Sequence, residues 1–502
     1  MSMRAELVDL RGCLDQLFQG IAQMPAIEIA GLSSDSRKLD KEHLFLAVQG
    51  ATSHGLDFLR QVEAVGAAAV VFDSSTGATP ESSLPVIGVE GLAGYLGEIA
   101  NRWYGSPSKH LRVTGVTGTN GKTTVAYLAA QCLMRLGRKC GFVGTLGAGV
   151  DEISGEGGMT TPACLDLHEI LAGFCNQGVA DAAIEVSSHA LEQGRVDGVR
   201  FDSAIFTNLS RDHIDYHGSM DAYFESKASL FLDHDVCHRI VSLDNEYGVE
   251  LADRCGANVV TVSTQLDRVA NGRPHIFVRS VVADEAGSNV GIRSSWGDAE
   301  LQVSLPGDFN VANAMGVLAL LLCNDIALDD ACATIEQVTA PPGRMERVNR
   351  SVDDGLPLVY VDYSHTPASL EAALKALRLH CKGQLWCVFG CGGDRDRGKR
   401  PMMGAVAEHL SDVAIVTSDN PRSEPPKQII EEILEGMSAA AISLDDRVEA
   451  ISHAVRSASS DDIVLIAGKG HENYQVFGSK ILPFSDYEEA GKALSGRGAG
   501  GS

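Results

Sequence analysis

The apolar positions of the chain form short runs that alternate with stretches of helical spacing. Residues 111–116 read as a short buried strand, and apolar side chains then recur at helical spacing from Val125 to Leu136. Short apolar runs predict further strands at residues 182–186, 203–206, 358–362, 385–389, 413–417 and 463–467, and helical spacing predicts helices at residues 220–232 and 367–377. Because strands and helices alternate in this way in parallel sheets covered by helices, we predict an α/β fold.

Breaks in this pattern predict three domains, which the length of 502 residues also favours. We expect a small α/β N-terminal domain at residues 1–105, a central domain with a mostly parallel sheet at residues 106–340, and a Rossmann-like C-terminal domain at residues 341–494. Pro341 and Pro342 mark the last boundary, because they stop a helix and form a short, stiff hinge. The Gly- and Ser-rich residues 495–502 predict a disordered tail.

Composition narrows the classes of function. Apolar residues make up 44% and charged residues 21%, which is typical of a soluble globular protein. The longest aliphatic run is short and the N-terminus has no apolar secretion signal, so we expect a cytoplasmic protein without membrane insertion. The net charge of −25 argues against nucleic acid as a partner, and twelve cysteines without a Cys-x-x-Cys pair predict free thiols. We expect a monomer.

A glycine-rich turn follows the strand at residues 111–116. It reads Gly118-Thr119-Asn120-Gly121-Lys122-Thr123-Thr124. Such a turn presents backbone N–H groups and a helix N-terminus to an anion, with Lys122 reaching outer phosphates and the Thr123 hydroxyl a magnesium ion. The common motif would have its first glycine at Val116, and the alternative is an ordinary turn with a solvated lysine. We interpret the turn as a phosphate loop, which makes the central domain a P-loop-type nucleotide-binding domain.

Polar side chains also follow the other strands of the central domain. Glu185 stands where such folds hold the nucleotide's magnesium, although a carboxylate there could equally cap the next helix. The loop at residues 207–217 concentrates groups suited to metal binding, proton transfer or a hydrogen-bonded turn: Asp212, His213, Asp215 and His217.

Two further features of the central domain have competing interpretations. Lys227 lies among aromatic and aliphatic residues of a predicted helix, a pattern that by itself is typical of a surface lysine with only its stem buried. Asn310 and Asn313, at the start of a helix rich in Ala and Leu, would contact a base or ribose, or cap the helix.

Each C-terminal strand is followed by a polar loop marked by glycine or proline. These loops lie at residues 363–367, 390–401, 418–422 and 468–472. Parallel sheets bind ligands at the carboxyl ends of their strands, and the arginines and lysines gathered there suit carboxylates or phosphates. We therefore predict a second ligand site in the C-terminal domain.

Together these motifs resemble the Mur ligase family over essentially the whole chain. The resemblance is carried by residues 118–124, 185–189, 210–217, 342–344 and 362–367, and the shortened phosphate loop is that family's own version. Residues 419–422 and 468–472 resemble the members that add the third amino acid of the peptide. The resemblance implies an ATP-dependent amide-bond ligase with Mg²⁺ as cofactor, which forms ADP and phosphate.

The implied reaction joins meso-diaminopimelate to the D-Glu of UDP-N-acetylmuramoyl-L-Ala-D-Glu through an acyl phosphate, in peptidoglycan precursor synthesis. The alternative is a sibling ligase that adds L-lysine to the same precursor. A folate-extending ligase does not need the N-terminal domain, and a phosphate-loop switch does not need the carboxylate-binding loops of the third domain.

The resemblance also implies a role for individual residues. The UDP-sugar peptide would be bound by Ser34, Ser36, Ala51, Thr52, Ser53, Thr160, Thr161, Ser187, Gln193 and Arg195, while Met159 stands where the family has a polar residue. ATP would be bound by Gly118, Thr119, Asn120, Gly121, Lys122, Thr123, Thr124, Asn310 and Arg344. Lys227 aligns with a lysine that the family carbamylates, which reverses the interpretation above. Catalysis is assigned to Lys122, Lys227, His213 and Glu185, and magnesium to Thr123, Glu185, His213 and the Lys227 carbamate.

Diaminopimelate would be bound by Arg395, Asp419, Asn420, Pro421, Arg422, Gly468 and Glu472. Diaminopimelate has a carboxylate and an amine at its far end, whereas lysine has only the amine. The guanidinium of Arg422 would pair with that carboxylate and Glu472 with the ammonium, so lysine would leave Arg422 facing a cation. The alternative is a surface arginine that follows an Asn-Pro turn.

Overall fold

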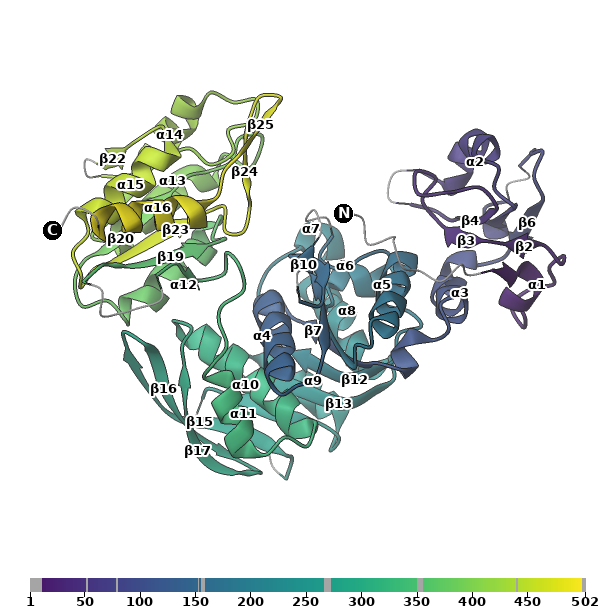
Figure 1. Cartoon of the computed structure of the whole chain (residues 1–502), viewed down its shortest axis with the longest axis horizontal. Helices are drawn as coiled ribbons and strands as arrows, with labels where there is room; N and C mark the ends of the chain where they lie inside the picture. Colours follow the sequence, from purple (N-terminus) through teal and green to yellow (C-terminus); the bar gives the residue numbers. More distant parts are fainter. Residues whose placement is uncertain are drawn as a thin grey trace. The chain divides into compact units, whose positions relative to one another are not determined.

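The computed structural model of the chain confirms an α/β fold with mostly parallel sheets (Figure 1). It describes residues 11–50, 53–77, 80–151, 153–154, 159–265, 272–349, 355–438 and 441–498. The chain divides into two compact units. The first comprises Met1–Lys122, Leu133–Val241 and Asn245–Val259, and the second comprises Thr123–Cys132, Ser242–Asp244 and Val260–Ser502.

The first unit begins with a four-stranded parallel sheet of order β3-β4-β5-β6. Its strands are β3 (Gly31–Ser33), β4 (His43–Ala47), β5 (Ala69–Asp73) and β6 (Val86–Val89), with α1 (Leu14–Leu17), α2 (Leu59–Val65), α3 (Leu96–Trp103) and the pair β1 (Gly12–Cys13) and β2 (Glu28–Ile29) around it. The runs of apolar, β-branched and aromatic residues that predict β4 and β5 place Leu44, Phe45 and Val70 in the core. The sequence predicts strands at residues 44–48 and 68–72, and the observed β4 and β5 lie within one residue of these positions.

A second group of hydrogen-bonded strands in the first unit has the order β10-β9-β8-β11-β7-β12-β13, and β8, β11, β7, β12 and β13 are parallel. Its strands are β7 (Arg112–Thr117), β8 (Cys140–Gly144), β9 (Gly147–Gly149), β10 (Ile153–Ser154), β11 (Asp181–Glu185), β12 (Phe201–Phe206) and β13 (Val236–Ser242). The helices along this part of the chain are α4 (Lys122–Arg135), α5 (Cys164–Asn176), α6 (Ser188–Glu192), α7 (Ile214–His217), α8 (Met220–Leu232) and α9 (Glu246–Cys255). The carboxyl ends of β7, β11 and β12 therefore meet at one edge.

The second unit contains two larger groups of strands. The first consists of β14 (Val260–Ser263), β15 (His275–Asp284), β16 (Gly287–Ser294) and β17 (Gly297–Val303), accompanied by α10 (Asp308–Cys323) and α11 (Leu328–Ile335). The second has the order β18-β19-β23-β20-β21-β22, in which only the pairing of β18 with β19 is antiparallel.

The strands of this six-stranded sheet are β18 (Glu346–Arg347), β19 (Leu358–Asp362), β20 (Leu385–Phe389), β21 (Val413–Val416), β22 (Ile442–Ser443) and β23 (Ile463–Ala467). Helices α12 (Pro367–Arg378), α13 (Lys399–Leu410) and α14 (Pro426–Leu434) contribute to the core on one face, and α15 (Arg447–Ser457) and α16 (Asp486–Gly498) to the core on the other. A hairpin of β24 (Tyr474–Phe477) and β25 (Lys480–Pro483) precedes α16. The central strands have apolar side chains on both faces because helices cover both.

The end of the chain differs from expectation. Residues 495–498, predicted to be disordered, form the last turn of α16, and residues 499–502 lie outside the described part. Ala490, Ala493 and Leu494 pack into the core, which stabilises the helix beyond what its Gly-rich sequence predicts. Among the described residues no helix is both long and apolar enough to cross a membrane.

Candidate functional site

The predicted phosphate loop lies between the end of β7 and the start of α4. Gly118 has a φ of 145°, and a Cβ on it would lie 2.0 Å from Thr207 Oγ1, so only glycine fits. The side chain of Lys122 turns back over the loop, where Nζ donates to the carbonyl oxygens of Gly118 and Thr119, each at 2.9 Å. The loop thus carries a cation at its centre.

The loop that follows β12 holds the phosphate loop in shape. The backbone N–H of Thr119 donates to the carbonyl oxygen of Asn208 at 2.9 Å, and that of Asn120 donates to Asn208 Oδ1 at 3.0 Å. Thr207 Oγ1 donates to the Asn120 carbonyl at 2.6 Å. Asn208 was not among the predicted site residues, although its position two residues after a predicted strand was a usable signal.

Lys227 lies beneath this loop rather than at the surface. Its side chain is 1% exposed, and Nζ donates to the Gly118 carbonyl at 2.8 Å and lies 4.7 Å from the centre of the Tyr223 ring. Burial, and then the charge of Lys122, lower the pKa of Lys227 well below its usual value. The surface position that helical spacing alone suggested is therefore wrong.

Glu185 is fully buried at the end of β11. One carboxylate oxygen accepts from the backbone N–H of Thr145 at 2.8 Å, and the other accepts from the Thr145 hydroxyl at 3.3 Å. The next helix, α6, is capped by the hydroxyl of Ser187, which accepts from the N–H of Ala190 at 3.2 Å. Glu185 is thus not the cap of that helix, which favours the ligand interpretation.

His213 belongs to a cluster of rings that the sequence indicated only in part. It adopts a left-handed φ of 53°, and its ring centre lies 4.9 Å from that of His189. The ring centre of His189 lies 4.0 Å from that of Tyr216, and the pKa of His189 is lowered by burial and by the neighbouring histidines. Nε2 of His217 lies 2.9 Å from Ser188 Oγ.

Among the described residues, no group of three or more His, Cys, Asp and Glu side chains is arranged to hold a metal. The predicted ligands would instead supply mainly oxygen: a hydroxyl from Thr123, the buried carboxylate of Glu185 and a carbamate on Lys227. Oxygen donors suit Mg²⁺, which also keeps several water ligands, so these residues fit the ion. The imidazole of His213 is the softer member of the set.

Four of the residues predicted for the sugar peptide form one network in the first unit. Arg195 donates to the Thr161 carbonyl at 3.0 Å and, through Nε, to Gln193 Oε1 at 3.0 Å. The backbone N–H of Ser187 donates to Thr161 Oγ1 at 3.1 Å. Gln193 also donates to the hydroxyl of Tyr216 at 3.0 Å, which links this network to the ring cluster.

The remaining residues predicted for this substrate lie in other loops. Thr160 Oγ1 accepts from the Thr145 hydroxyl at 3.3 Å, and Ser36 Oγ lies 3.3 Å from Gln61 Oε1. Ser34 and Ser53 are partly exposed, while Ala51 and Thr52 lie outside the described residues. Met159 is 50% exposed.

Asn310 and Arg344, two of the residues predicted to bind the nucleotide, have partners of their own. Asn310 is buried and donates to the Pro306 carbonyl at 2.8 Å, while Asn313 donates to Asn310 Oδ1 at 3.1 Å. Neither bond is a helix cap: the N-cap residue of α10 is Gly307, and no side chain in the described part of the chain caps this helix, so the capping alternative is wrong. The guanidinium of Arg344 lies 4.7 Å from the centre of the Tyr363 ring.

The predicted amino-acid site follows the carboxyl ends of β21 and β23. Asn420 donates to Glu472 Oε2 at 2.8 Å and accepts from Lys469 Nζ at 3.1 Å. Lys469 also donates to Glu472 Oε2 at 3.0 Å, and its side chain is fully buried. Gly468 permits this turn with a φ of 116°, and Asp419 accepts from the N–H of Asn420 at 2.6 Å. Lys469, whose charge neutralises Glu472, was not among the predicted site residues.

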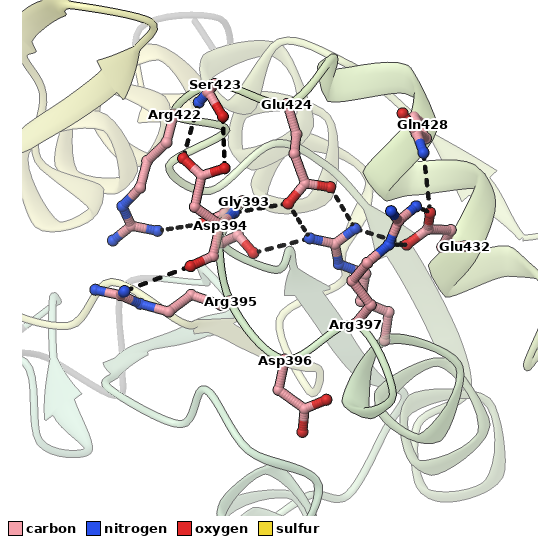
Figure 2. A network of polar contacts seen from close by, with 12 residues as sticks. Gly393, Asp394, Arg395, Asp396, Arg397, Arg422, Ser423, Glu424, Gln428 and Glu432 are labelled. Atoms are coloured by element: carbon pink, nitrogen blue, oxygen red, sulfur yellow. Dashed lines mark hydrogen bonds and ion pairs between the residues drawn. The ribbon is translucent and has the colours of Figure 1, made fainter.

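Two arginines complete this site. Arg422, which follows Pro421, has a left-handed φ of 52° and donates through Nη1 to the Gly393 carbonyl at 2.8 Å. Arg395 lies 3.4 Å from the Asp394 carbonyl and is otherwise exposed. Both guanidinium groups lie on the same side of the Gly393–Asp394 backbone (Figure 2). A concentration of positive charge therefore stands beside the Asn420–Lys469–Glu472 cluster on the edge of one sheet.

Comparison with known proteins places these motifs in a family. Three family models match: the catalytic domain of the Mur ligase family at residues 28–104, the Mur ligase middle domain at residues 116–321, and the Mur ligase glutamate ligase domain at residues 343–470. The chain is 44% identical to the UDP-N-acetylmuramoyl-L-alanyl-D-glutamate–2,6-diaminopimelate ligase of Pseudomonas syringae pv. tomato, over 94% of this chain and 96% of that protein.

Two further relatives have the same description. The ligase from Pseudomonas aeruginosa is 44% identical over 93% of this chain and 95% of its own. A solved structure described as a UDP-N-acetylmuramoyl-L-alanyl-D-glutamate–2,6-diaminopimelate ligase superposes with a TM-score of 0.73 at 32% identity, covering 97% of this chain and 99% of its own.

Proposed function

The chain belongs to the Mur ligase family, and on this basis we propose a role for each part of its site. It is an ATP-dependent acid–amino-acid ligase that adds diaminopimelate to UDP-N-acetylmuramoyl-L-Ala-D-Glu, the reaction for which its relatives at 42–44% identity are named. We take the meso isomer of diaminopimelate as the acceptor. The observation that favours diaminopimelate over lysine is the presence of Arg422 and Arg395 beside Glu472. This arrangement offers a guanidinium to a distal carboxylate and a carboxylate to the neighbouring ammonium.

The first half-reaction activates the substrate's carboxylate. A carboxylate is a poor acylating agent, so the γ-phosphoryl group of ATP is transferred to it to form an acyl phosphate, and ADP leaves. Lys122 would release the Gly118 and Thr119 carbonyls and turn to the phosphates, where its charge offsets the charge that develops. Magnesium, when bound, neutralises the phosphate oxygens, with Thr123, Glu185, His213 and a Lys227 carbamate as its proposed ligands.

The lowered pKa of Lys227 supports its proposed carbamylation. Only a neutral amine attacks carbon dioxide, and the proton leaves the nitrogen as the carbamate forms. A buried amine beside Lys122 is more often neutral than an exposed one. The resulting anion would also pair with the charge of Lys122.

In the second half-reaction the amine of the bound amino acid attacks the acyl phosphate. A tetrahedral intermediate collapses with loss of phosphate, which leaves the new amide. The Thr161, Ser187, Gln193 and Arg195 network would hold the sugar peptide, and the Asn420, Arg422 and Glu472 cluster the amino acid. Holding both substrates turns a bimolecular step into a positioned one.

Four further expectations from the sequence remain predictions: the three-domain boundaries, the closing hinge at Pro341 and Pro342, the monomeric state and the cytoplasmic location.

ATP-dependent phosphate release by the purified protein tests this function. One reaction contains UDP-N-acetylmuramoyl-L-Ala-D-Glu with meso-diaminopimelate, and a matched reaction replaces diaminopimelate by L-lysine. We expect release only with diaminopimelate, because lysine leaves Arg422 facing a cation. If no phosphate is released with either amino acid, the proposed function is wrong. Equal release with both amino acids would show that Arg422 does not select between them.

A further inference from the structure

Arg400 is a fully buried arginine that no step of the proposed reaction uses. It lies in α13, and its side chain is 0% exposed. Its two terminal nitrogens bind both oxygens of Glu424, Nη1 to Oε2 at 2.9 Å and Nη2 to Oε1 at 2.8 Å. Nη1 also donates to Glu432 Oε2 at 2.6 Å, and Nη2 to the Gly392 carbonyl at 3.3 Å. A buried guanidinium with two carboxylates is costly to assemble and costly to break by removing one partner.

Glu424 also binds the loop at residues 392–397. Its Oε1 accepts from the backbone N–H of Asp394 at 2.6 Å, while Asp394 accepts from the N–H and hydroxyl of Ser423 at 3.1 and 2.5 Å (Figure 2). The hydrogen bonds from Arg400 lower the pKa of Glu424 to about 2, so its carboxylate stays charged at neutral pH. Arg400 therefore joins the loop after β20 to the loop after β21 through Glu424.

The same two loops carry both arginines of the amino-acid site. Asp394 and Arg422 each adopt a left-handed backbone, with φ of 53° and 52°, which non-glycine residues keep only when their surroundings enforce it. The N–H of Gly393 donates to the Asn420 carbonyl at 2.9 Å, and the Gly393 carbonyl accepts from Arg422. A Cβ on Gly393 would lie 1.9 Å from the Pro421 carbonyl oxygen, so the loops are in direct contact.

We propose that the Arg400–Glu424 pair is a positioning device for recognition of the amino acid, which fixes Arg422 and Arg395 where they meet the distal carboxylate of diaminopimelate. The inference rests on the proposed function. Arg400 itself does not touch the substrate. It acts by locking Asp394 and Ser423 together, so that the carbonyl that orients the Arg422 guanidinium stays in place. If this carbonyl moved, the Arg422 guanidinium would move with it, and its bidentate contact with a carboxylate would weaken more than a contact with a single point charge.

The test uses Glu424→Gln and Arg400→Lys in the full-length enzyme. Glu424→Gln keeps the shape of the side chain and loses its charge. Arg400→Lys keeps the positive charge but loses the planar guanidinium that binds both carboxylate oxygens. We expect KM for diaminopimelate to rise about tenfold or more in Glu424→Gln, and less in Arg400→Lys, as expected for loss of a charged hydrogen bond. KM for ATP and for the UDP-dipeptide should stay within about twofold, and the preference for diaminopimelate over lysine should fall.

Arg397→Ala is the matched control. Arg397 is exposed and pairs with Glu432, so its removal takes one cation from the same network without breaking the Arg400–Glu424 pair. This variant should keep the wild-type KM for diaminopimelate. Equal changes in all three KM values, or none in Glu424→Gln, would overturn the inference, and if Arg400→Lys does not fold, Glu424→Gln decides alone. Wild-type enzyme that fails to use diaminopimelate would instead refute the proposed function, before any variant is compared.

Discussion

At the scale of single residues, burial sets the chemistry of Lys227. An ammonium without a carboxylate partner in hydrogen-bonding range loses its hydration when it is buried, and the carbonyl of Gly118 replaces only part of it. The pKa of Lys227 in the folded chain is therefore lowered, whereas in the unfolded chain it returns to about 10.4. Between these two values the unfolded chain binds more protons, so the unmodified protein gains stability as pH rises through this window.

Lys227→Met should remove this penalty. In buffer free of carbon dioxide, we expect the variant to be more stable than the wild type, by about 1.4 kcal/mol for each unit by which the pKa is lowered. The difference should be largest below the folded-state pKa and should disappear as pH approaches about 10.4. Urea unfolding of both proteins across this pH range measures it. A difference independent of pH would show that Lys227 is not the titrating group.

The same variant should lose ligase activity, because methionine cannot supply the carbamate oxygens. Added short carboxylic acids should restore part of the activity of Lys227→Ala, where the smaller side chain leaves room for them. Full activity without rescue would contradict the carbamate role. The two readouts are independent, since the stability measurement needs no substrate and the rescue needs no pH titration.

Many of the candidate site residues were accessible from the sequence because they lie at or shortly after the ends of strands. Glu185, Asn420 and Gly468 are examples, since carboxyl ends of parallel strands gather at one edge. Lys469 and Arg400 were not recognised, because their burial and their partners Asn420 and Glu424 come from parts of the chain far away in the sequence. Helical spacing wrongly placed Lys227 at the surface for a related reason. Periodicity shows which residues share a face of a helix, but it does not show which other segments cover that face.

At the scale of secondary-structure elements, the phosphate loop depends on a single backbone position. Gly118→Ala should destabilise the protein by about 1–3 kcal/mol and raise KM for ATP, because the φ of 145° and the contact with Thr207 both exclude a side chain. Gly137→Ala is the control after the other end of α4, where φ is 76° and no atom lies within 4 Å of the added Cβ. It should cost about 1–2 kcal/mol and leave KM for ATP unchanged. Equal kinetics for both variants would contradict the role of the loop.

The elements themselves were predicted well wherever burial dictates the pattern. The observed α8, β19, β20 and β23 have the predicted bounds, because each is a continuous periodic or apolar run. The end of α16 was missed, since its last turn contains two glycines and depends on packing that local propensity does not report. The sequence predicts short strands and turns at residues 240–305, but not the antiparallel pairing of β15, β16 and β17.

At the scale of the whole molecule, the linker before the six-stranded sheet is in contact with the amino-acid site. The N–H of Gly343 donates to Glu346 Oε2 at 2.7 Å, and the same glycine touches the loop at residues 468–472 that holds Lys469 and Glu472. Glu346 is largely buried, which raises its pKa despite this bond. Because the predicted hinge touches the predicted binding loop, we expect the position of the linker to depend on the occupancy of the site.

Gly343→Ala tests this coupling. The residue has a φ of 67°, and an added Cβ would lie 2.0 Å from the backbone nitrogen of His471, so the loop that holds Glu472 must move. We expect KM for diaminopimelate to rise and kcat to fall, with KM for ATP changed least. Gly355→Ala carries the same backbone strain, with a φ of 65° and open space around the Cβ, and should cost about 1–2 kcal/mol in unfolding free energy. Gly343→Ala should cost more, because the clash with the loop backbone adds to the same strain. If Gly343→Ala loses affinity for diaminopimelate and Gly355→Ala keeps it, contact with the loop rather than strain in the linker controls binding. Identical kinetics would place the hinge outside amino-acid recognition.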